Sequence, residues 1–182
     1  MSQTFAKVAS EDFIAARIAK DAAFLARYDP RRDREEFERA RRYALSFSLI
    51  LLDVDQLRTI NERLGTAGGD LVLSTLGGLL QRELRAPDFV SRYGGDEFAL
   101  ILPETDLEGA RRSIARVRER ILSGGFGEIQ PQDRPRLSAG IVTFPHPAVG
   151  DSQDLFALVE AALLRGKAQT EGRIGTADSV AA

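Results

Sequence analysis

The chain has 182 residues, of which 43% are hydrophobic and 29% are charged, and its formal net charge is −2. This length suits one domain with a sizeable core, and the near-neutral charge provides no global basic field to attract nucleic acid or an anionic membrane. The absence of cysteine excludes disulfides, thiolate metal sites and cysteine nucleophiles, and a single histidine, His146, argues against zinc sites and serine–histidine triads.

The first 30 residues are predicted to form a lead-in helix. Apolar residues recur at helical spacing across residues 3–28, and Asp29-Pro30 ends the helix because the residue before proline avoids the α region. This helix could pair with another chain or a regulatory partner, or it could pack on its own domain. The region has no signal-peptide pattern, and no apolar run in the chain approaches the roughly 20 residues of a membrane span, so we expect a soluble, cytoplasmic protein.

A second helix is predicted from Arg31 to Tyr43. Its arginines could form a nucleic-acid patch, but interleaved acidic residues at i, i+3 and i+4 spacing favour a solvated, salt-bridged face. The next segment, Phe47–Val54, is a near-continuous apolar run. We expect it to be a central strand that is buried on both faces of a sheet.

Two helices should follow this strand. The strand ends in Asp53-Val54-Asp55, and a short helix is predicted at Gln56–Leu64. Three glycines in segment 65–69 are expected to interrupt the helical path. A helix with a broad apolar face should then run from Asp70 to about Leu84.

Two strand-like runs around a pair of glycines predict a β-hairpin. The runs are Asp88–Tyr93 and Glu97–Leu102, and Gly94-Gly95 supplies a turn that tolerates positive φ. Asp96 and Glu97 follow at once, so the tip combines bare backbone with two carboxylates. Bare backbone can lie close to a phosphate and a carboxylate can hold its metal, although an ordinary hairpin with an acidic, soluble tip has the same pattern.

The rest of the chain predicts a helix at Leu107–Leu122, a strand at Arg136–Phe144 and a last helix at Asp151–Thr170, before a frayed tail at 177–182. The order of elements is strand, helices, hairpin, helix, strand, helix. This order predicts an α/β sandwich of the α+β type, with one mainly antiparallel central sheet flanked by helices.

Two aspartates in this fold suggest a metal site. Asp53 ends a buried strand and Asp96 lies on a hairpin tip, and such positions can meet at one edge of a sheet. A pair of divalent cations could bind between them, because Mg²⁺ takes one or two protein carboxylates and completes its shell with water and phosphate oxygens. Alternatively, a strand-end aspartate such as Asp53 caps the following helix.

The helix after Asp53 offers groups that suit a nucleotide. The amides of Gln56 and Leu57 could hold a polyphosphate at the helix terminus, and Arg58 could add a cation. Asn61 and Asp70 could together bind a guanine edge, the amide contacting O6 and N7 and the carboxylate N1–H and N2–H. Asn61 could equally be a plain surface residue.

Gly94-Gly95-Asp96-Glu97-Phe98 spells the signature of the GGDEF family of bacterial diguanylate cyclases, and the chain resembles this family from about residue 31 to 173. Leu52–Asn61 looks like the family's strand-and-helix motif, and Gly69-Asp70 falls at the expected distance. The resemblance implies a palm-like fold related to nucleotide cyclases and polymerases, with the GGDEF domain at 31–176. It also implies an enzyme that joins two GTP molecules, one on each protomer of an antiparallel homodimer, into cyclic di-GMP with loss of two pyrophosphates.

The resemblance assigns roles to single residues. Two divalent cations per half-site, Mg²⁺ or Mn²⁺, would be held by Asp53, the carbonyl of Val54 and Asp96. Glu97 would help to activate the attacking 3′-hydroxyl or bind the second metal, and Arg58, a lysine in many members, would supply a catalytic cation. The remaining substrate contacts would come from the guanine-reading pair, the hairpin glycines, the helix start and two C-terminal cations: Asn61, Asp70, Gly94, Gly95, Gln56, Leu57, Lys167 and Arg173.

A second motif of the family is also present. Arg85-Ala86-Pro87-Asp88 matches its RxxD inhibitory motif, with five residues between Asp88 and Gly94. In members that carry this motif, a stacked dimer of the product binds there and locks the protein in an unproductive arrangement. Arg116 lies where a partner arginine is often found. The alternative is a surface turn with a local salt bridge.

The chain departs from the family pattern near both ends. The entry motif is poorly matched at Ala23–Arg32, Leu164 replaces a tyrosine, and Arg173 follows Lys167 two residues late, which could carry it off the phosphate. The metal and guanine residues are unchanged, so we expect an active enzyme. The alternatives are a weak or inactive GGDEF domain that senses cyclic di-GMP through the RxxD site, and a GTP-binding scaffold that signals through its N-terminal helix.

Overall fold

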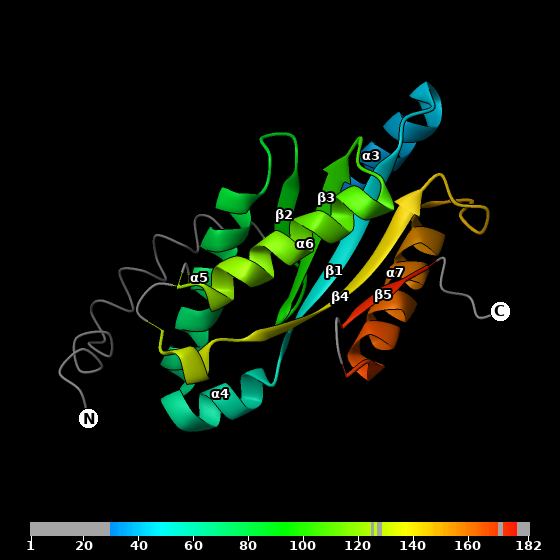
Figure 1. Ribbon diagram of the computed structural model, residues 1–182. Helices are drawn as coiled ribbons and strands as arrows, with labels where there is room; N and C mark the ends of the chain where they lie inside the picture. Colours follow the sequence, from blue (N-terminus) through cyan, green and yellow to red (C-terminus); the bar gives the residue numbers. More distant parts are fainter. Residues whose placement is uncertain (1–29, 125, 127–128, 171–172, 178–182) are drawn as a thin grey trace.

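The computed structural model describes residues 30–124, 126, 129–170 and 173–177, drawn as coloured ribbons in Figure 1. The predicted lead-in helix and residues 178–182 lie outside this part. The helices are α3 (Pro30–Tyr43), α4 (Leu57–Leu64), α5 (Thr66–Glu83), α6 (Leu107–Leu122) and α7 (Ser152–Ala168), with a 3₁₀ helix at Pro131–Asp133. The strands are β1 (Phe47–Asp55), β2 (Phe89–Arg92), β3 (Glu97–Pro103), β4 (Arg136–Phe144) and β5 (Ile174–Thr176). None of the helices described is both long and apolar enough to cross a membrane.

The strands form one sheet in the order β2-β3-β1-β4-β5. The β1–β3, β1–β4 and β2–β3 pairs are antiparallel, and β4–β5 is parallel. The mainly antiparallel sheet confirms the predicted fold class. The strand predicted to be central is β1, which pairs along both edges and is buried over eight of its nine residues.

Helices cover both faces of the sheet, as Figure 1 shows. Successive side chains of a strand point to opposite faces. Accordingly, Ile50 and Leu52 belong to a core cluster with residues of α5 and α6, whereas Leu49 and Leu51 belong to a second cluster with residues of α3 and α7. An apolar run without alternation is what a strand between two helical layers requires.

The bounds of two predicted helices need correction, and one element was missed. Helix α5 begins at Thr66 and not at Asp70, because the chain breaks at Gly65 alone of the three glycines: Gly65 has φ 75°, and Gly68 and Gly69 are helical. Helix α7 runs from Ser152 to Ala168, so the predicted helix was too long at both ends.

The missing element is β5, a strand of three residues that lies beside β4. Ala177, the first residue of the predicted tail, is buried and donates its backbone N–H to Ile141 O at 3.1 Å. The ordered sheet therefore extends further toward the C-terminus than the sequence indicated.

Close packing between α7 and the sheet depends on Gly140 in β4. A Cβ at this position would lie 2.8 Å from Leu163 Cα and closer still to Val159 O and Leu163 N, all backbone atoms of α7. Backbone atoms cannot rotate away as a side chain can. The absence of a Cβ at Gly140 thus sets how near α7, which carries Lys167, lies to the sheet.

We expect Gly140→Ala to lower the free energy of unfolding by about 2–3 kcal/mol, because α7 must move outward to make room. The matched control is Gly78→Ala in α5, where the nearest atom to an added Cβ is the flexible end of Arg82 at 3.4 Å. That change should stabilise the protein by about 0.5–1 kcal/mol through its effect on helix propensity. Urea unfolding of both variants measures the difference, and equal effects would contradict the role of Gly140.

Candidate active site

A cavity of about 410 Å³ opens where β1 ends beside the tip of the β2–β3 hairpin. Its walls combine carboxylates, cations and the backbone that opens α4. The residues that line it are Asp53, Val54, Asp55, Gln56, Leu57, Arg58, Asp96, Arg136, Lys167 and Arg173. Eight of these ten were candidate site residues in the sequence, and the other two, Asp55 and Arg136, were not.

Backbone hydrogen bonds join the hairpin tip to the end of β1. Val54 N donates to Asp96 O at 3.0 Å, and Asp53 lies opposite Glu97 in the strand pairing. Tyr93 N and Gly94 N both donate to Glu97 O, at 2.9 and 3.3 Å. The two aspartates predicted to meet at one sheet edge are therefore neighbours in the same cavity.

An arginine that the sequence reasoning missed braces this tip. Arg92 Nε donates to Gly94 O at 3.1 Å, and Arg92 Nη2 donates to Gly95 O at 2.6 Å. A Cβ on Gly95 would meet no atom within 4 Å, so the backbone there faces open space. The tip is thus held from one side and accessible from the other, as a backbone that approaches a ligand must be.

Charge is concentrated around Asp53. Lys167 Nζ donates to Asp53 Oδ2 at 2.6 Å. Burial raises the pKa of Asp53, the bond and charge of Lys167 oppose this, and the charges of Asp96 and Asp55 add to the rise. Burial and then the charge of Asp53 likewise raise the pKa of Glu97. The acids repel one another, so a cation at this point is electrostatically favoured.

The donor set is compatible with a hard divalent cation. Within the described residues, no group of three or more histidine, cysteine or acidic side chains is arranged to hold a metal. Two aspartates and a backbone carbonyl nevertheless suit Mg²⁺, which is usually bound by one or two carboxylates with water and phosphate oxygens. The chemistry of Asp53, Asp96 and the Val54 carbonyl therefore fits the predicted metal.

The start of α4 forms another wall of the cavity. Gln56 precedes the helix in the left-handed region, with φ 58° and ψ 31°, and no side chain caps the helix. The first N–H groups of a helix lack intrahelical acceptors and favour an anion. Arg58 is at the rim, with a side chain that is 92% exposed and paired with Glu62 at 3.1 Å.

The two predicted guanine readers come from adjacent helices and do not line this cavity. Asn61 belongs to α4, and its side chain lies against Gly69 of α5, where a Cβ would collide with it. Asp70 is the next residue of α5. The Oδ1 of Asn61 is buried and has no hydrogen-bond partner among the described residues.

The predicted inhibitory residues lie at the opposite end of the hairpin. Arg85 and Asp88 are paired at 3.1 Å, with side chains that are 55% and 2% exposed. Arg85 Nη2 also donates to Thr105 Oγ1 at 2.6 Å and to Pro103 O at 3.1 Å, next to the far end of β3. Arg116 donates to Glu83 O at 2.6 Å, two residues from Arg85 in the chain. The seven residues of β3 separate this cluster from Asp96 by about 20 Å.

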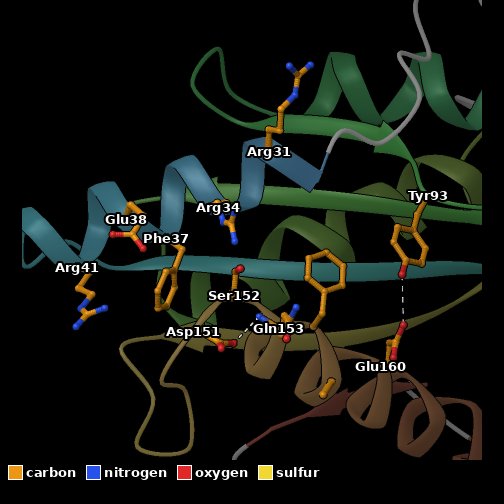
Figure 2. A pocket seen from close by; sticks show the side chains of 12 residues that line it. Arg31, Arg34, Phe37, Glu38, Arg41, Tyr93, Asp151, Ser152, Gln153 and Glu160 are labelled. Atoms are coloured by element: carbon orange, nitrogen blue, oxygen red, sulfur yellow. Dashed lines mark hydrogen bonds between the residues drawn. The ribbon is translucent and has the colours of Figure 1, made fainter.

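A larger groove of about 730 Å³ runs between α3 and α7 (Figure 2). Its walls carry charges of both signs, so it has no evident preference for an anion. Tyr93 stacks on Phe156 with ring centroids 5.8 Å apart. Its hydroxyl donates to Glu160 at 3.4 Å, drawn in Figure 2 as the dashed line between these two residues. These contacts fasten the hairpin tip to α7, the helix that supplies Lys167.

Because its surroundings disfavour a charged carboxylate, we expect Asp53→Asn to raise the Tm of the protein without metal and nucleotide at neutral pH. The sign follows from the raised pKa: the charged form of Asp53 is less favourable in the folded than in the unfolded state, and asparagine is a permanently neutral isostere. The gain in wild-type stability from protonating Asp53 should appear as pH falls toward the ordinary aspartate range. Thermal unfolding at several pH values checks this, and a lower Tm for the variant at neutral pH would refute it.

Comparisons with known proteins identify the family of the chain. The model of the GGDEF family, described as "Diguanylate cyclase, GGDEF domain", matches residues 31–173. The chain is 35% identical over 147 residues to diguanylate cyclase DgcP of Pseudomonas aeruginosa, covering 80% of this chain and 22% of that protein. It is 31% identical over 134 residues to the probable diguanylate cyclase DgcC of Escherichia coli, covering 74% of this chain and 36% of that protein. The chain thus spans less than half the length of these relatives.

Solved structures show the same similarity. The active GGEEF domain of a diguanylate cyclase from Vibrio cholerae matches with a TM-score of 0.74 and 28% identity, over 84% of this chain and 97% of that one. Diguanylate cyclase SiaD of Pseudomonas aeruginosa, solved with its activator SiaC, matches with a TM-score of 0.64 and 32% identity, over 75% of this chain and 52% of that one. With the family motif at the hairpin tip and the matched residues spanning most of the described fold, the chain belongs to the GGDEF family.

Proposed function

We propose that the chain is a diguanylate cyclase that condenses two GTP molecules into cyclic di-GMP with release of two pyrophosphates. The observation that carries this proposal is the bond of 3.0 Å between Val54 N and Asp96 O, which brings the two candidate metal-binding aspartates into one cavity with Lys167. The named diguanylate cyclases among its relatives support the same reaction. We expect it to occur in the cytoplasm.

The reaction is a phosphoryl-group substitution that happens twice. The 3′-hydroxyl of one GTP attacks the α-phosphorus of the other, a P–O bond forms, and the bond to the bridging oxygen of pyrophosphate breaks. The hydroxyl proton goes to Glu97, whose raised pKa suits a carboxylate that accepts a proton. Alignment and charge neutralisation supply most of the rate enhancement in such reactions.

Each candidate residue has a place in this proposal. Asp53, Asp96 and the Val54 carbonyl would hold Mg²⁺ or Mn²⁺, two ions per half-site, which would neutralise phosphate charge. The other candidates act on the nucleotide itself: Asn61 and Asp70 bind guanine, Gly94 and Gly95 admit the nucleotide, and Gln56, Leu57, Arg58, Lys167 and Arg173 face the phosphates.

Catalysis requires two protomers, because each half-site binds one GTP and the product contains two. The cavity lies at the end of β1 beside the hairpin tip, and we infer an antiparallel homodimer in which the two cavities face each other. A regulatory partner could act through the N-terminal segment. Among the relatives, SiaD was solved with an activator protein.

Feedback by the product is the second part of the proposal. Arg85 is half exposed and is held by the buried carboxylate of Asp88, so its guanidinium is fixed and accessible. Such a group can bind phosphate and stack on guanine together. The same observation favours the alternative function, a GGDEF domain with little activity that binds cyclic di-GMP as a receptor through this cluster.

The enzyme hypothesis is tested by incubating the protein with GTP and Mg²⁺ and resolving the nucleotides by chromatography. We expect cyclic di-GMP from the wild type and a loss of on the order of 100-fold or more for Asp96→Ala, because one metal-binding carboxylate is gone. Glu108→Gln, in an exposed ion pair of α6, is the surface control. No product from the wild type at high protein concentration would exclude the enzyme and leave the receptor.

Feedback is tested with Arg85→Ala. The variant should bind cyclic di-GMP at least about tenfold more weakly, since a charged hydrogen-bonding group is lost. Its total yield of cyclic di-GMP from GTP should rise, because the accumulated product no longer inhibits the enzyme. The control is Arg42→Ala, which changes an exposed arginine in the last turn of α3, on a different element from the cluster. Unchanged product affinity and unchanged yield would rule out this site.

A further inference from the structure

We propose that Asp55 and Ser138 are positioning residues that orient Arg173 toward the phosphates of the bound nucleotide. The inference rests on the proposed function, since it assigns an anionic phosphate chain to this side of the cavity. The sequence analysis assigned no role to Asp55 or Ser138, although Asp55 lies within the Leu52–Asn61 motif. Asp55 and Arg173 line the cavity together, and Ser138 lies directly beneath them in β4.

Three side chains form a closed set of contacts. Ser138 Oγ donates to Asp55 Oδ1 at 2.7 Å and accepts from Arg173 Nε at 2.8 Å. Arg173 Nη2 donates to Asp55 Oδ1 at 3.0 Å, and Arg173 Nε lies 2.9 Å from Asp55 Oδ2 as an ion pair without hydrogen-bond geometry. These contacts are mostly shielded from solvent, since the side chains of Asp55 and Arg173 are 10% and 29% exposed.

These contacts leave part of the Arg173 guanidinium available. A guanidinium has five N–H groups. Nε is used by Ser138, one N–H of Nη2 by Asp55 and one N–H of Nη1 by Gln169 O at 3.4 Å. One N–H on each terminal nitrogen remains, which is the fork that binds a phosphate through two parallel hydrogen bonds.

The same contacts separate Asp55 from metal binding. Asp55 is two residues after Asp53 on the same strand, so a carboxylate there could be mistaken for a further metal ligand. Both of its oxygens face Arg173, and one also accepts from Ser138. Asp55 therefore neutralises and orients a cation of the protein and is poorly disposed to bind an added one.

The backbone of Arg173 is held by contacts with β4 and α6. Arg173 O accepts from Ala139 N at 2.9 Å and from Arg118 Nη2 at 3.2 Å, and β5 begins at the next residue. The positive φ of Arg173, 40°, is consistent with a backbone fixed by its surroundings. Two extra residues between Lys167 and Arg173 consequently need not move the guanidinium, because β1 and β4 determine where it lies.

The test compares two ligands in the presence of Mg²⁺ by isothermal titration calorimetry. The first is a GTP analogue with a methylene group between the α- and β-phosphorus, which cannot release pyrophosphate, and the second is GMP, which lacks the β- and γ-phosphates. Asp55→Asn keeps the size of the side chain and removes its charge. We expect Asp55→Asn and Arg173→Ala each to lower the affinity for the analogue about tenfold. The affinity for GMP should stay within about twofold of the wild-type value.

A double variant adds a second readout. If Asp55 acts through Arg173, adding Asp55→Asn to Arg173→Ala should cause almost no further loss of affinity for the analogue. Glu36→Gln is the matched control, since Glu36 is 10% exposed like Asp55 and pairs with Arg39 away from the cavity. If Asp55→Asn fails to fold, Ser138→Ala, which keeps the Cβ, removes one contact of the same set and should weaken the analogue selectively.

Each outcome decides the matter. An equal loss of affinity for the analogue and for GMP would mean that Asp55 only maintains the fold. Unchanged affinity for the analogue would overturn the inference directly. Synthesis of cyclic di-GMP is measured separately by chromatography. A wild type that makes the product while the variants keep full affinity contradicts this inference alone. If the wild type makes no product while the variants bind the analogue more weakly, only the cyclase function is contradicted.

Discussion

The register of β1 against its two neighbours is the constraint on which the site depends. Pairing places Asp53 opposite Glu97 on β3 and opposite Ser138 on β4. Side chains of a strand alternate between faces, so a slip of one residue would turn every side chain to the other face. The two apolar layers make such a slip prohibitively costly, because Ile50 and Leu52 would exchange cores with Leu49 and Leu51. Hydrophobic burial in the middle of β1 therefore fixes the polar chemistry at its end.

The cavity holds opposed charges that the empty protein must balance by itself. Lys167 pairs with Asp53, and Arg173 pairs with Asp55. Beneath them, burial lowers the pKa of Arg118, and the charge of Asp55 opposes that effect while Arg173 adds to it. Partly buried charges are tolerated because each has a partner. Under the proposed function, the metal and the nucleotide replace the contact between Asp53 and Lys167, whereas Arg173 stays paired with Asp55. The arrangement therefore serves binding at some expense of stability.

The β2–β3 hairpin links the two regions of interest. Its tip is braced by Arg92 and by the contact of Tyr93 with α7, and its other end carries the Arg85–Asp88 pair. About 20 Å of paired strand lies between them. A ligand at the far end would therefore not occupy the cavity. Under the proposed feedback, this separation favours inhibition through an unproductive arrangement of protomers over direct competition with GTP.

The element types were predictable because their signals are local. The apolar run of β1, the helical periodicity of α6 and the paired glycines of the hairpin each lie within a few residues of one another, and the structure has them where the sequence indicated. The start of α5 was misjudged because a glycine-rich segment can break a helix or continue it, and only Gly65 takes a positive φ. Strand β5 was missed since three residues carry no periodic signal, and the strand forms only against β4.

The sequence by itself determined the family and indicated two carboxylates that line the cavity, Asp53 and Asp96. The motif at the hairpin tip and the spacing of Asp53, Asn61 and Asp70 are readable without coordinates. It could not reveal the roles of three further residues. Asp55 and Arg136 are brought into the cavity by the pairing of β1 with β4, and Arg92 contacts the hairpin tip only once the tip has folded. The place of Arg173 was likewise decided by tertiary structure. Counting residues from Lys167 suggested displacement from the site, but hydrogen bonds from two distant strands set the position of a side chain more strongly than the length of the loop before it.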